Sequence, residues 1–352
     1  MSDTMWVLGA TGRSGRGIAR LLAESGHSVV LAGRAEAGLA GLAAELGGDV
    51  TVVSGSYESL LVQLRAAAPA VVVNTIGPFA RTSVQVIEAC PPGTHYVDIG
   101  NELPGIHAVL DGHARAVADG RTVVTGAGFG VLATESVVLR VCDGRPAPAR
   151  VRVDAIPSLA THKGVIGSAL AGSMLDGVPE GGRRVEHGRL VRSPLAAARE
   201  QLTTPAGDTV STAALPTGDL LAAWRGSKAA SVVAATSVIP SGPAVRVVFP
   251  VLSLLMRSSA LRHFAIGQLA RISIPERERP REFSWGHARA EWDDGTSREG
   301  WLRLGDAQLF TEAVAAEVAR RLRTQRVPAG AYTPGALFGA ALATDVGGEF
   351  VR

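Results

Sequence analysis

The stretch that decides the fold is MWVLGATGRSGRGIARLLAESGHSVVLAGR, residues 5–34. A short apolar strand at 5–8 leads into the glycine-rich turn GATGRSG, and Ile18, Leu21 and Leu22 then recur at helical spacing. Glycines let the backbone approach a pyrophosphate, while the first turn of a helix offers unpaired N–H groups and the positive end of its dipole. Because SVVLAGR supplies a second strand at the expected distance, the stretch predicts a dinucleotide-binding site.

The turn itself is expected to hold the cofactor. Its glycines follow a G-x-x-G-x-x-G pattern in place of the G-x-G-x-x-G form, so the prediction depends on the position of the turn between a strand and a helix. The cofactor-binding residues expected here are Gly9, Thr11, Gly12, Arg13, Ser14 and Gly15.

Arg34, at the end of the second strand, indicates which cofactor is used. NAD-type sites carry an Asp or Glu about 20 residues beyond the turn, which binds the ribose 2′-hydroxyl and repels a 2′-phosphate. That carboxylate is absent here, and Arg34 offers a guanidinium fork suited to a phosphate, with Arg13 as a second cation. We therefore expect NADP(H) in preference to NAD(H), the alternative being that Arg34 is a solvated surface arginine.

Composition narrows the functional class. With 352 residues the chain has room for roughly two domains. Its 35 Lys and Arg residues against 32 Asp and Glu residues leave a charge of +3, too small for the concentrated basic face of a nucleic-acid-binding protein. The two cysteines, Cys90 and Cys142, make neither a disulfide framework nor a Cys/His metal cluster. We expect no metal and a cytoplasmic location.

One apolar segment, PAVRVVFPVLSLLMR at 243–257, raises the question of membrane contact. It is shorter than the ~20 apolar residues that span a bilayer, and Arg246 interrupts it. We expect a buried helix or a wall of the substrate pocket there, and no integral membrane association. The alternative is a membrane-peripheral enzyme of lipid metabolism, in which this segment contacts the membrane surface. No cleavable signal is expected, because the first apolar run ends at Gly9 and is followed by Arg13 and Arg16.

The rest of the N-terminal part alternates strand-like and helix-like segments. Apolar runs at 49–55, 70–77, 95–100 and 121–128 are separated by segments with helical patterning. This alternation predicts a doubly wound parallel sheet with helices on both faces, whose ligands bind at the carboxyl ends of the strands.

The chain is therefore expected to have an α/β fold with two domains. The first, at 1–128, is a Rossmann domain, and the C-terminal segment at about 330–352 is expected to pack back on it. The second, at 129–329, is an α+β mixed-sheet domain for substrate binding and dimerisation, because residues 283–305 read as two alternating strands around an Asp-Gly turn.

Three motifs after predicted strands or near the C-terminus point to a family. They are NTIGPF at 74–79, GTHYVDIGNE at 93–102 and YTPGALFGAAL at 332–342. Together they resemble the saccharopine dehydrogenase-like reductases, which include the trans-acting enoyl reductases. The family's GFDSxPxD turn reads GFGVLATE at 128–135, with Gly130 in place of the aspartate. The resemblance implies that the turn after the fourth strand lies against the nicotinamide half of the cofactor, through Asn74, Thr75, Gly77, Pro78 and Phe79.

Short-chain dehydrogenases use a similar glycine turn but a different proton donor. They need a Tyr-x-x-x-Lys pair, in which the lysine lowers the pKa of the tyrosine. None of the three tyrosines of this sequence has a lysine four positions later. The usual mechanism of that class is therefore excluded.

Hydride transfer also needs a group that protonates or polarises the other end of the double bond. The favoured candidates are Lys163 and His162, in a loop that precedes a predicted helix, followed by Tyr96 and Asp98 after a parallel strand. Structural alternatives stay open for all four. His162 and Lys163 would then be a solvated loop, Tyr96 a packed aromatic with its hydroxyl at the rim, and Asp98 the cap of the turn at Gly100.

The function expected from these features is that of an NADPH-dependent reductase. The resemblance permits hydride transfer to a C=C or a C=N bond, as in an enoyl or an imine reductase. The apolar segment at 243–257 favours a small hydrophobic or carrier-bound substrate, and a role in secondary metabolism fits such a molecule. The competing hypothesis is a catalytically silent NADP(H)-binding protein that senses redox state.

Three tryptophans in the C-terminal part of the sequence are relevant to the oligomeric state. Trp285, Trp292 and Trp301 lie on the predicted strands of the second domain and are interpreted as core or dimer-interface residues. A sheet face rich in aromatic residues can support a homodimer, which is the assembly expected here.

Overall fold

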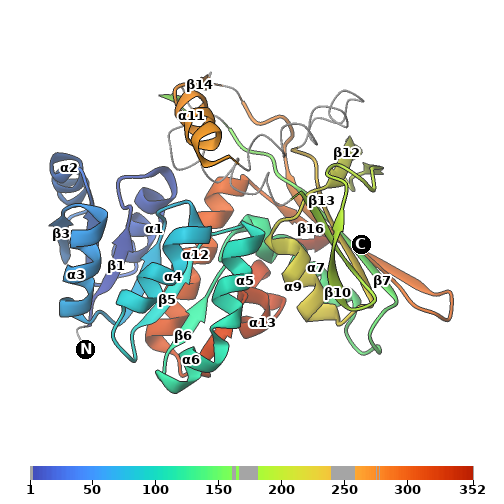
Figure 1. The fold of residues 1–352 in the computed structure, drawn as a ribbon, viewed down its shortest axis with the longest axis horizontal. Helices are drawn as coiled ribbons and strands as arrows, with labels where there is room; N and C mark the ends of the chain where they lie inside the picture. Colours follow the sequence, from blue (N-terminus) through green and yellow to red (C-terminus); the bar gives the residue numbers. More distant parts are fainter. Residues whose placement is uncertain are drawn as a thin grey trace. The chain divides into compact units, whose positions relative to one another are not determined.

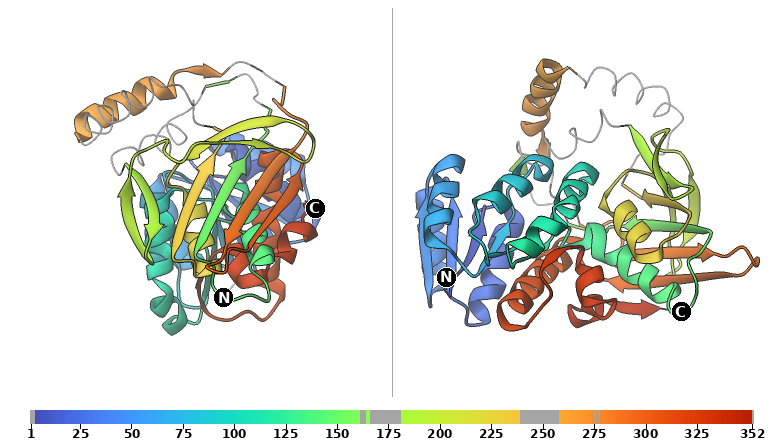
Figure 2. Two further views of the ribbon diagram at one scale, coloured as in Figure 1. Left: turned by 90° about the vertical axis from the view of Figure 1, so that its right-hand side faces the viewer. Right: turned by 60° about the horizontal axis from the view of Figure 1, so that its bottom comes forward.

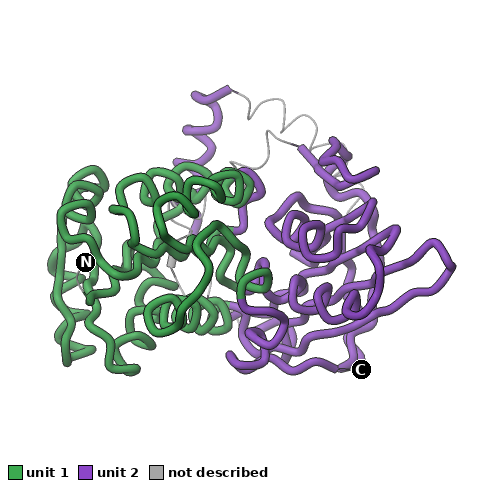
Figure 3. Tube along the Cα trace, turned by 90° about the horizontal axis from the view of Figure 1, so that it is seen from below, with its two compact units in different colours: residues 1–100, 105–128, 308–337 green, residues 101–104, 129–307, 338–352 purple. Residues whose placement is uncertain are grey.

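The computed structural model describes residues 3–160, 164–165, 181–238, 258–274, 276 and 278–351. The chain divides into two compact units (Figure 3). Unit 1 comprises residues 1–100, 105–128 and 308–337, and unit 2 comprises residues 101–104, 129–307 and 338–352. The chain therefore contributes three separate segments to each unit.

Unit 1 is built on a parallel sheet, drawn mostly in blue and cyan in Figure 1. Within the described residues it has seven strands: β1 (Met5–Leu8), β2 (Val29–Gly33), β3 (Val50–Ser54), β4 (Val71–Asn74), β5 (His95–Asp98), β6 (Thr122–Val124) and β17 (Gly330–Tyr332). Their order is β17-β6-β5-β4-β1-β2-β3, and β1 pairs in parallel with both β2 and β4. The chain thus reverses its direction of travel across the sheet between β1 and β4, where dinucleotides bind in doubly wound folds. The expected Rossmann sheet is confirmed.

Helices cover this sheet. They are α1 (Arg13–Glu24), α2 (Glu36–Leu46), α3 (Tyr57–Ala67), α4 (Phe79–Ala89), α5 (Leu103–Asp111), α6 (His113–Ala118), α12 (Ala307–Thr324) and α13 (Pro334–Phe338). Because βαβ crossovers are right-handed and the strand order runs both ways from β1, α1 and α2 lie on one face and α3 and α4 on the other. With both faces covered, the strands are apolar runs, and Val7, Leu31 and Val73 are completely buried.

The C-terminal part of the chain completes unit 1. β17 adds to the sheet by parallel pairing with β6, in the register Gly330↔Thr122. The preceding α12 buries Phe310, Val314 and Leu322. The sequence places residues 308–329 in the second domain, whereas the structure places them in unit 1, and only residues 338–352 return to unit 2. Long-range pairing of this kind leaves no local signal in the sequence.

Unit 2 contains a mixed sheet, seen face-on in Figure 2. Nine strands of the described chain form it: β7 (Arg150–Ile156), β9 (Gly182–Glu186), β10 (Arg189–Ser193), β11 (Glu200–Thr203), β12 (Thr209–Ala214), β13 (Ser231–Thr236), β15 (Ser284–Glu291), β16 (Ser297–Leu304) and β18 (Glu349–Val351). β13 and β7 run parallel, and the neighbouring pairs are antiparallel. The expected second, mixed-sheet domain is confirmed.

The helices of unit 2 are α7 (Phe129–Val141), α9 (Gly218–Ser227), α11 (Ser259–Ala270) and α14 (Ala341–Asp345), and a short ribbon pairs β8 (Gly164–Val165) with β14 (Ser273–Ile274). α7 packs closely on the sheet, because a Cβ at Gly300 would lie 2.9 Å from Val141. None of the helices in the described chain is both long and apolar enough to cross a membrane. The segment at 243–257 lies outside the described residues.

The late tryptophans lie in or against the core of unit 2. Trp285 and Trp301 meet edge to face with ring centroids 5.9 Å apart, and both pack with Ile156. The indole N–H of Trp292 donates to the carbonyl of Pro146 at 2.8 Å. Of the two interpretations given for these residues, core packing accounts for all three.

Candidate functional site

Close packing explains the three glycines of the turn after β1. Gly9 adopts φ +80°, and a Cβ there would lie 2.7 Å from Thr75 Oγ1. Gly12 donates its N–H to the carbonyl of Gly9 at 2.8 Å. A Cβ at Gly15 would overlap that same carbonyl oxygen and lie 2.9 Å from Ala10 Cα. The turn can therefore be this compact only with glycines, and it leads directly into α1.

The N-terminus of α1 is suited to an anion. Gly12 is its N-cap and contributes no side-chain cap, and the first hydrogen bond of the helix runs from the N–H of Arg16 to the carbonyl of Gly12 at 3.0 Å. The N–H groups of Arg13, Ser14 and Gly15 therefore precede the helical hydrogen-bond ladder. Such groups, together with the positive end of the helix dipole, are what binds phosphate at the start of a helix.

Two arginines beside this turn are exposed. Within the described chain, the guanidinium groups of Arg13 and Arg34 make no ion pair or hydrogen bond, whereas their neighbours Arg16 and Arg20 both pair with Glu45. Arg34 directly follows β2, at the carboxyl end of that strand. Both cations are thus available to a phosphate group in solution.

Asn74, at the carboxyl end of β4, is committed to internal hydrogen bonds. Its Oδ1 accepts from the N–H of Ile76 at 3.0 Å, and its Nδ2 donates to the hydroxyl oxygen of Tyr96 at 3.1 Å and to Thr82 Oγ1 at 3.4 Å. The side chain is completely buried. Asn74 therefore shapes the turn through internal hydrogen bonds of its amide, whereas the resemblance implied a contact with the nicotinamide half of the cofactor.

The remainder of this turn is half-buried. Thr75 Oγ1 donates to the carbonyl of Leu8 at 2.8 Å, which joins the ends of β4 and β1. Gly77 and Pro78 are linked by a cis peptide bond. Phe79 begins α4 and lies against Gly100, where a Cβ would be 2.9 Å from its ring. The turn and the ring of Phe79 thus lie at the carboxyl end of β4.

Asp98, one of the catalytic candidates, is the centre of a buried network. Its carboxylate accepts five hydrogen bonds, from the hydroxyls of Ser83, Tyr96 and Thr125 and from the N–H groups of Gly100 and Gly126, at 2.8–3.0 Å. Burial raises the pKa of Asp98, while these hydrogen bonds act in the opposite direction. The bond from Gly100 is the turn cap that the sequence analysis kept as the alternative. Asp98 therefore holds strand ends together from a completely buried position.

Tyr96, another candidate, is buried in the same network. Its hydroxyl lies between Asn74 and Asp98 and not at a rim, and its side chain is 0% exposed. Burial and the neighbouring Asp98 charge raise the pKa of Tyr96 well above its ordinary value. A phenol in this position is a structural donor, which corrects the catalytic role expected for it. The sequence showed that Asn74 and Asp98 follow adjacent strands, but not that Tyr96 joins them.

Sequence comparisons find relatives for part of the chain. No family model matches the sequence. A stretch of 131 residues is 32% identical to the trans-acting enoyl reductase of Mycobacterium tuberculosis strain H37Rv and 33% identical to that of Mycobacterium leprae. The match takes in 35% of this chain and 31% of each relative, so the chain covers less than a third of the length of these curated relatives.

The comparison with solved structures extends over the whole chain. The apo saccharopine dehydrogenase (L-Glu forming) of Saccharomyces cerevisiae aligns with 100% of both chains at a TM-score of 0.63 and 14% identity. The chain is similar in fold to this saccharopine dehydrogenase. At this identity the likeness establishes the shared fold, and the resemblance inferred from the strand-end motifs is confirmed.

At Gly130 the sequence differs from the GFDSxPxD turn of the family that it resembles, and the structure shows what surrounds this position. A Cβ at Gly130 would lie 2.7 Å from Asn101 Cγ, so Asn101 occupies the space that a side chain would need. Asn101 is held there because its Oδ1 accepts from the N–H of Gly218 at 3.0 Å.

A second buried carboxylate, that of Asp219, lies in unit 2. Asp219 accepts hydrogen bonds from Thr134 Oγ1 at 2.5 Å and Thr217 Oγ1 at 2.9 Å. Burial raises its pKa to about 7, and the charge of Glu135 acts in the same direction. Sequence reasoning missed this site. Asp219 belongs to no recognisable motif, and one of its hydrogen-bond donors, Thr134, comes from α7, which is distant in sequence.

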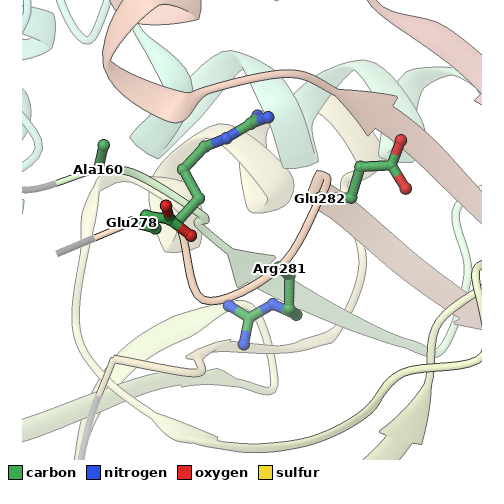
Figure 4. Close-up of a pocket in the computed structure, with 5 residues that line it drawn as sticks. Ala160, Glu278, Arg281 and Glu282 are labelled. Atoms are coloured by element: carbon green, nitrogen blue, oxygen red, sulfur yellow. The ribbon is translucent and has the colours of Figure 1, made fainter.

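The two favoured catalytic candidates, His162 and Lys163, lie outside the described residues. An open pocket of about 400 Å³ is lined by Ala160, which precedes these two residues in the sequence, and by Glu278, Arg279, Arg281 and Glu282 (Figure 4). Among the described lining residues, the charges of two arginines and two glutamates balance each other. Across the part of the chain that the structure describes, no cluster of His, Cys, Asp and Glu is arranged to hold a metal.

Proposed function

We propose that this chain is an NADPH-dependent reductase that transfers hydride to a C=C or C=N bond of a small, hydrophobic or carrier-bound organic substrate. The observation that carries the proposal is the uncapped N-terminus of α1 with two exposed, unpaired arginines, Arg13 and Arg34, beside it. The names of its relatives, a trans-acting enoyl reductase and a saccharopine dehydrogenase, support an oxidoreductase that uses a nicotinamide cofactor.

The residues of unit 1 fit the parts of such a cofactor. The N–H groups that open α1 would bind the pyrophosphate, and Arg34 with Arg13 would bind the 2′-phosphate as a charge-assisted pair. Phe79 would provide an apolar wall for the nicotinamide ring. When bound, NADPH supplies the hydride. Since Tyr96 and Asp98 are buried, the proton donor proposed here is Lys163 or His162.

The proposal also covers the cellular location and the oligomeric state of the enzyme. Two free cysteines, Cys90 and Cys142, suit a reducing cytoplasm, and burial raises the pKa of Cys90 to about 12, so its thiol is unreactive. We place the enzyme there as a homodimer, with a role in secondary metabolism.

Calorimetric titration with NADPH and with NADH tests the cofactor assignment. We expect Arg34→Ala to weaken NADPH binding by roughly 1.5 to 3 kcal/mol, the scale of a charge-assisted hydrogen bond, and to leave NADH binding unchanged. Arg20→Ala is the matched control, because Arg20 lies on α1 and is already paired with Glu45. Equal losses for both cofactors would contradict the role of Arg34, and a wild-type protein that binds neither nucleotide would overturn the proposed function.

A second candidate function follows from the buried state of Tyr96 and Asp98. With both of these groups enclosed, a catalytically silent NADP(H)-binding protein that senses redox state is the alternative. The two functions differ in cofactor turnover. A reductase consumes NADPH with at least one member of a panel of enones and imines, followed by nicotinamide absorbance, whereas a silent sensor holds NADPH without oxidising it.

A further inference from the structure

Helix α12 contacts the phosphate-binding turn through one side chain. Gln308, at the start of that helix, places its Nε2 2.9 Å from Ser14 Oγ in α1 and 2.9 Å from Glu312 Oε1, one turn further along α12. All three residues belong to unit 1, although Ser14 and Gln308 are separated by 294 positions in sequence. The contact therefore joins the glycine-rich turn to a segment from the C-terminal part of the chain.

The direction of these hydrogen bonds is fixed by chemistry. An amide nitrogen carries two protons and no acceptor site, so Gln308 donates one proton to the Glu312 carboxylate and one to Ser14 Oγ. Ser14 is thereby an acceptor toward Gln308, and its own hydroxyl proton is left to donate in another direction. That proton belongs to the second residue of α1, beside the N–H groups that precede the helical ladder.

The sequence around Gln308 keeps its amide in this orientation. Glu312 is 8% exposed and lies against Gly17 of α1, where a Cβ would overlap its carboxylate. A glycine at position 17 is thus what lets the carboxylate approach α1 and hold the amide. The amide in turn stands between that negative charge and Ser14.

We propose that Gln308 is a positioning residue for the cofactor pyrophosphate. It orients Ser14 so that the hydroxyl donates to a phosphate oxygen next to the N–H groups of α1. The proposal rests on the nicotinamide dinucleotide site proposed above and adds a residue from α12 to it. Because the pyrophosphate is common to NADPH and NADH, Gln308 acts on both cofactors alike, in contrast to Arg34.

A double-mutant cycle on the full chain tests this role. Gln308→Ala, Ser14→Ala and the double variant are titrated with NADPH and with NADH. We expect each single change to weaken both cofactors by roughly five- to tenfold, the scale of one lost hydrogen bond, and the double variant to lose little more than either single one. Gln308→Glu should lose more than Gln308→Ala, because the introduced carboxylate accepts the Ser14 proton and repels phosphate.

The controls separate positioning from folding. Leu309→Ala changes the next residue of α12, whose side chain is 64% exposed, and should leave both affinities unchanged. Thermal unfolding without cofactor measures the structural cost of each variant. A lower melting temperature with unchanged affinity assigns Gln308 a purely structural role and overturns the inference.

The remaining outcomes are also decisive. If the wild-type protein binds NADPH and the Gln308→Ala and Ser14→Ala losses simply add, the two residues act independently and the inference fails while the proposed function stands. If the wild-type protein binds neither nucleotide, both the inference and the function on which it rests are overturned.

Discussion

Two buried carboxylates show how differently single residues are accommodated in this chain. Asp98 accepts five hydrogen bonds, which compensate for the loss of water around an ionised group. Asp219 accepts from two threonine hydroxyls and lies near the buried Glu135, so its ionised form is less well compensated. Asp219, whose pKa burial raises to about 7, is therefore a residue whose protonation should influence the stability of the protein near neutral pH.

The prediction at Asp219 concerns the pH dependence of unfolding. Its folded pKa of about 7 lies above its ordinary value of 3.8, so between these values the folded protein keeps a proton that the unfolded chain has released. The stabilising contribution is complete below about pH 4 and is lost as pH rises through about 7, with a slope approaching about 1.4 kcal/mol per pH unit. Asp219→Asn should remove this loss.

Urea denaturation of both proteins at a series of pH values between 4 and 8 measures this effect. The unfolding free energy of Asp219→Asn minus that of the wild type should increase with pH across this range. Asp293→Asn, which changes an exposed carboxylate in the same unit, is the control and should follow the wild type. A difference between Asp219→Asn and the wild type that does not vary with pH would show that Asp219 is ionised in both states.

At the scale of elements, the helices α1 and α2 of unit 1 contain glycines of two kinds. Gly15 is required by packing, since a Cβ there would meet the backbone of the preceding turn. Gly41, in the middle of α2, has open space around the position of a Cβ. The same substitution should therefore have opposite effects at these two positions.

Alanine is predicted to lower the unfolding free energy at position 15 and to raise it at position 41. Gly15→Ala forces the turn and α1 apart and should cost about 2 kcal/mol or more of unfolding free energy, with weaker NADPH binding. Gly41→Ala restricts the unfolded chain and favours the helix, so it should stabilise the protein by roughly 0.5–1 kcal/mol without changing NADPH affinity. Denaturant unfolding and calorimetry measure both effects. A stable Gly15→Ala variant with normal affinity would show that the turn yields more easily than its geometry indicates.

The sequence predicted the elements whose signals are local. The β1 strand, the glycine turn, α1 and the position of Arg34 all lie within residues 5–34, so spacing and periodicity identify them. The roles of Tyr96 and Asp98 were not predictable in this way. Their burial depends on Asn74 from β4 and Thr125 after β6, and no short-range pattern reports which partners a polar side chain finds.

At the scale of the whole molecule, the Rossmann unit is assembled from segments far apart in the sequence. Strand β17 pairs with β6, and α12 buries Phe310, Val314, Val318 and Leu322 within unit 1. Each such side chain contributes about 1.5–3 kcal/mol when fully buried, so a fragment without α12 loses a substantial hydrophobic contribution. The first 128 residues therefore contain the cofactor turn but not a complete core.

This division predicts how fragments will fold. Residues 1–128 alone should lack a cooperative unfolding transition, because they expose the edge of β6 and the surface that α12 covers. Joining residues 308–337 to them through a short Gly/Ser linker should restore folding, since Gly128 already contacts Thr311. The same linked fragment with Val314→Asp and Val318→Asp is the matched control and should remain unfolded. Circular dichroism during thermal unfolding separates the three fragments, and a cooperative transition in residues 1–128 alone at the temperature of the linked fragment would show that the C-terminal segment is dispensable.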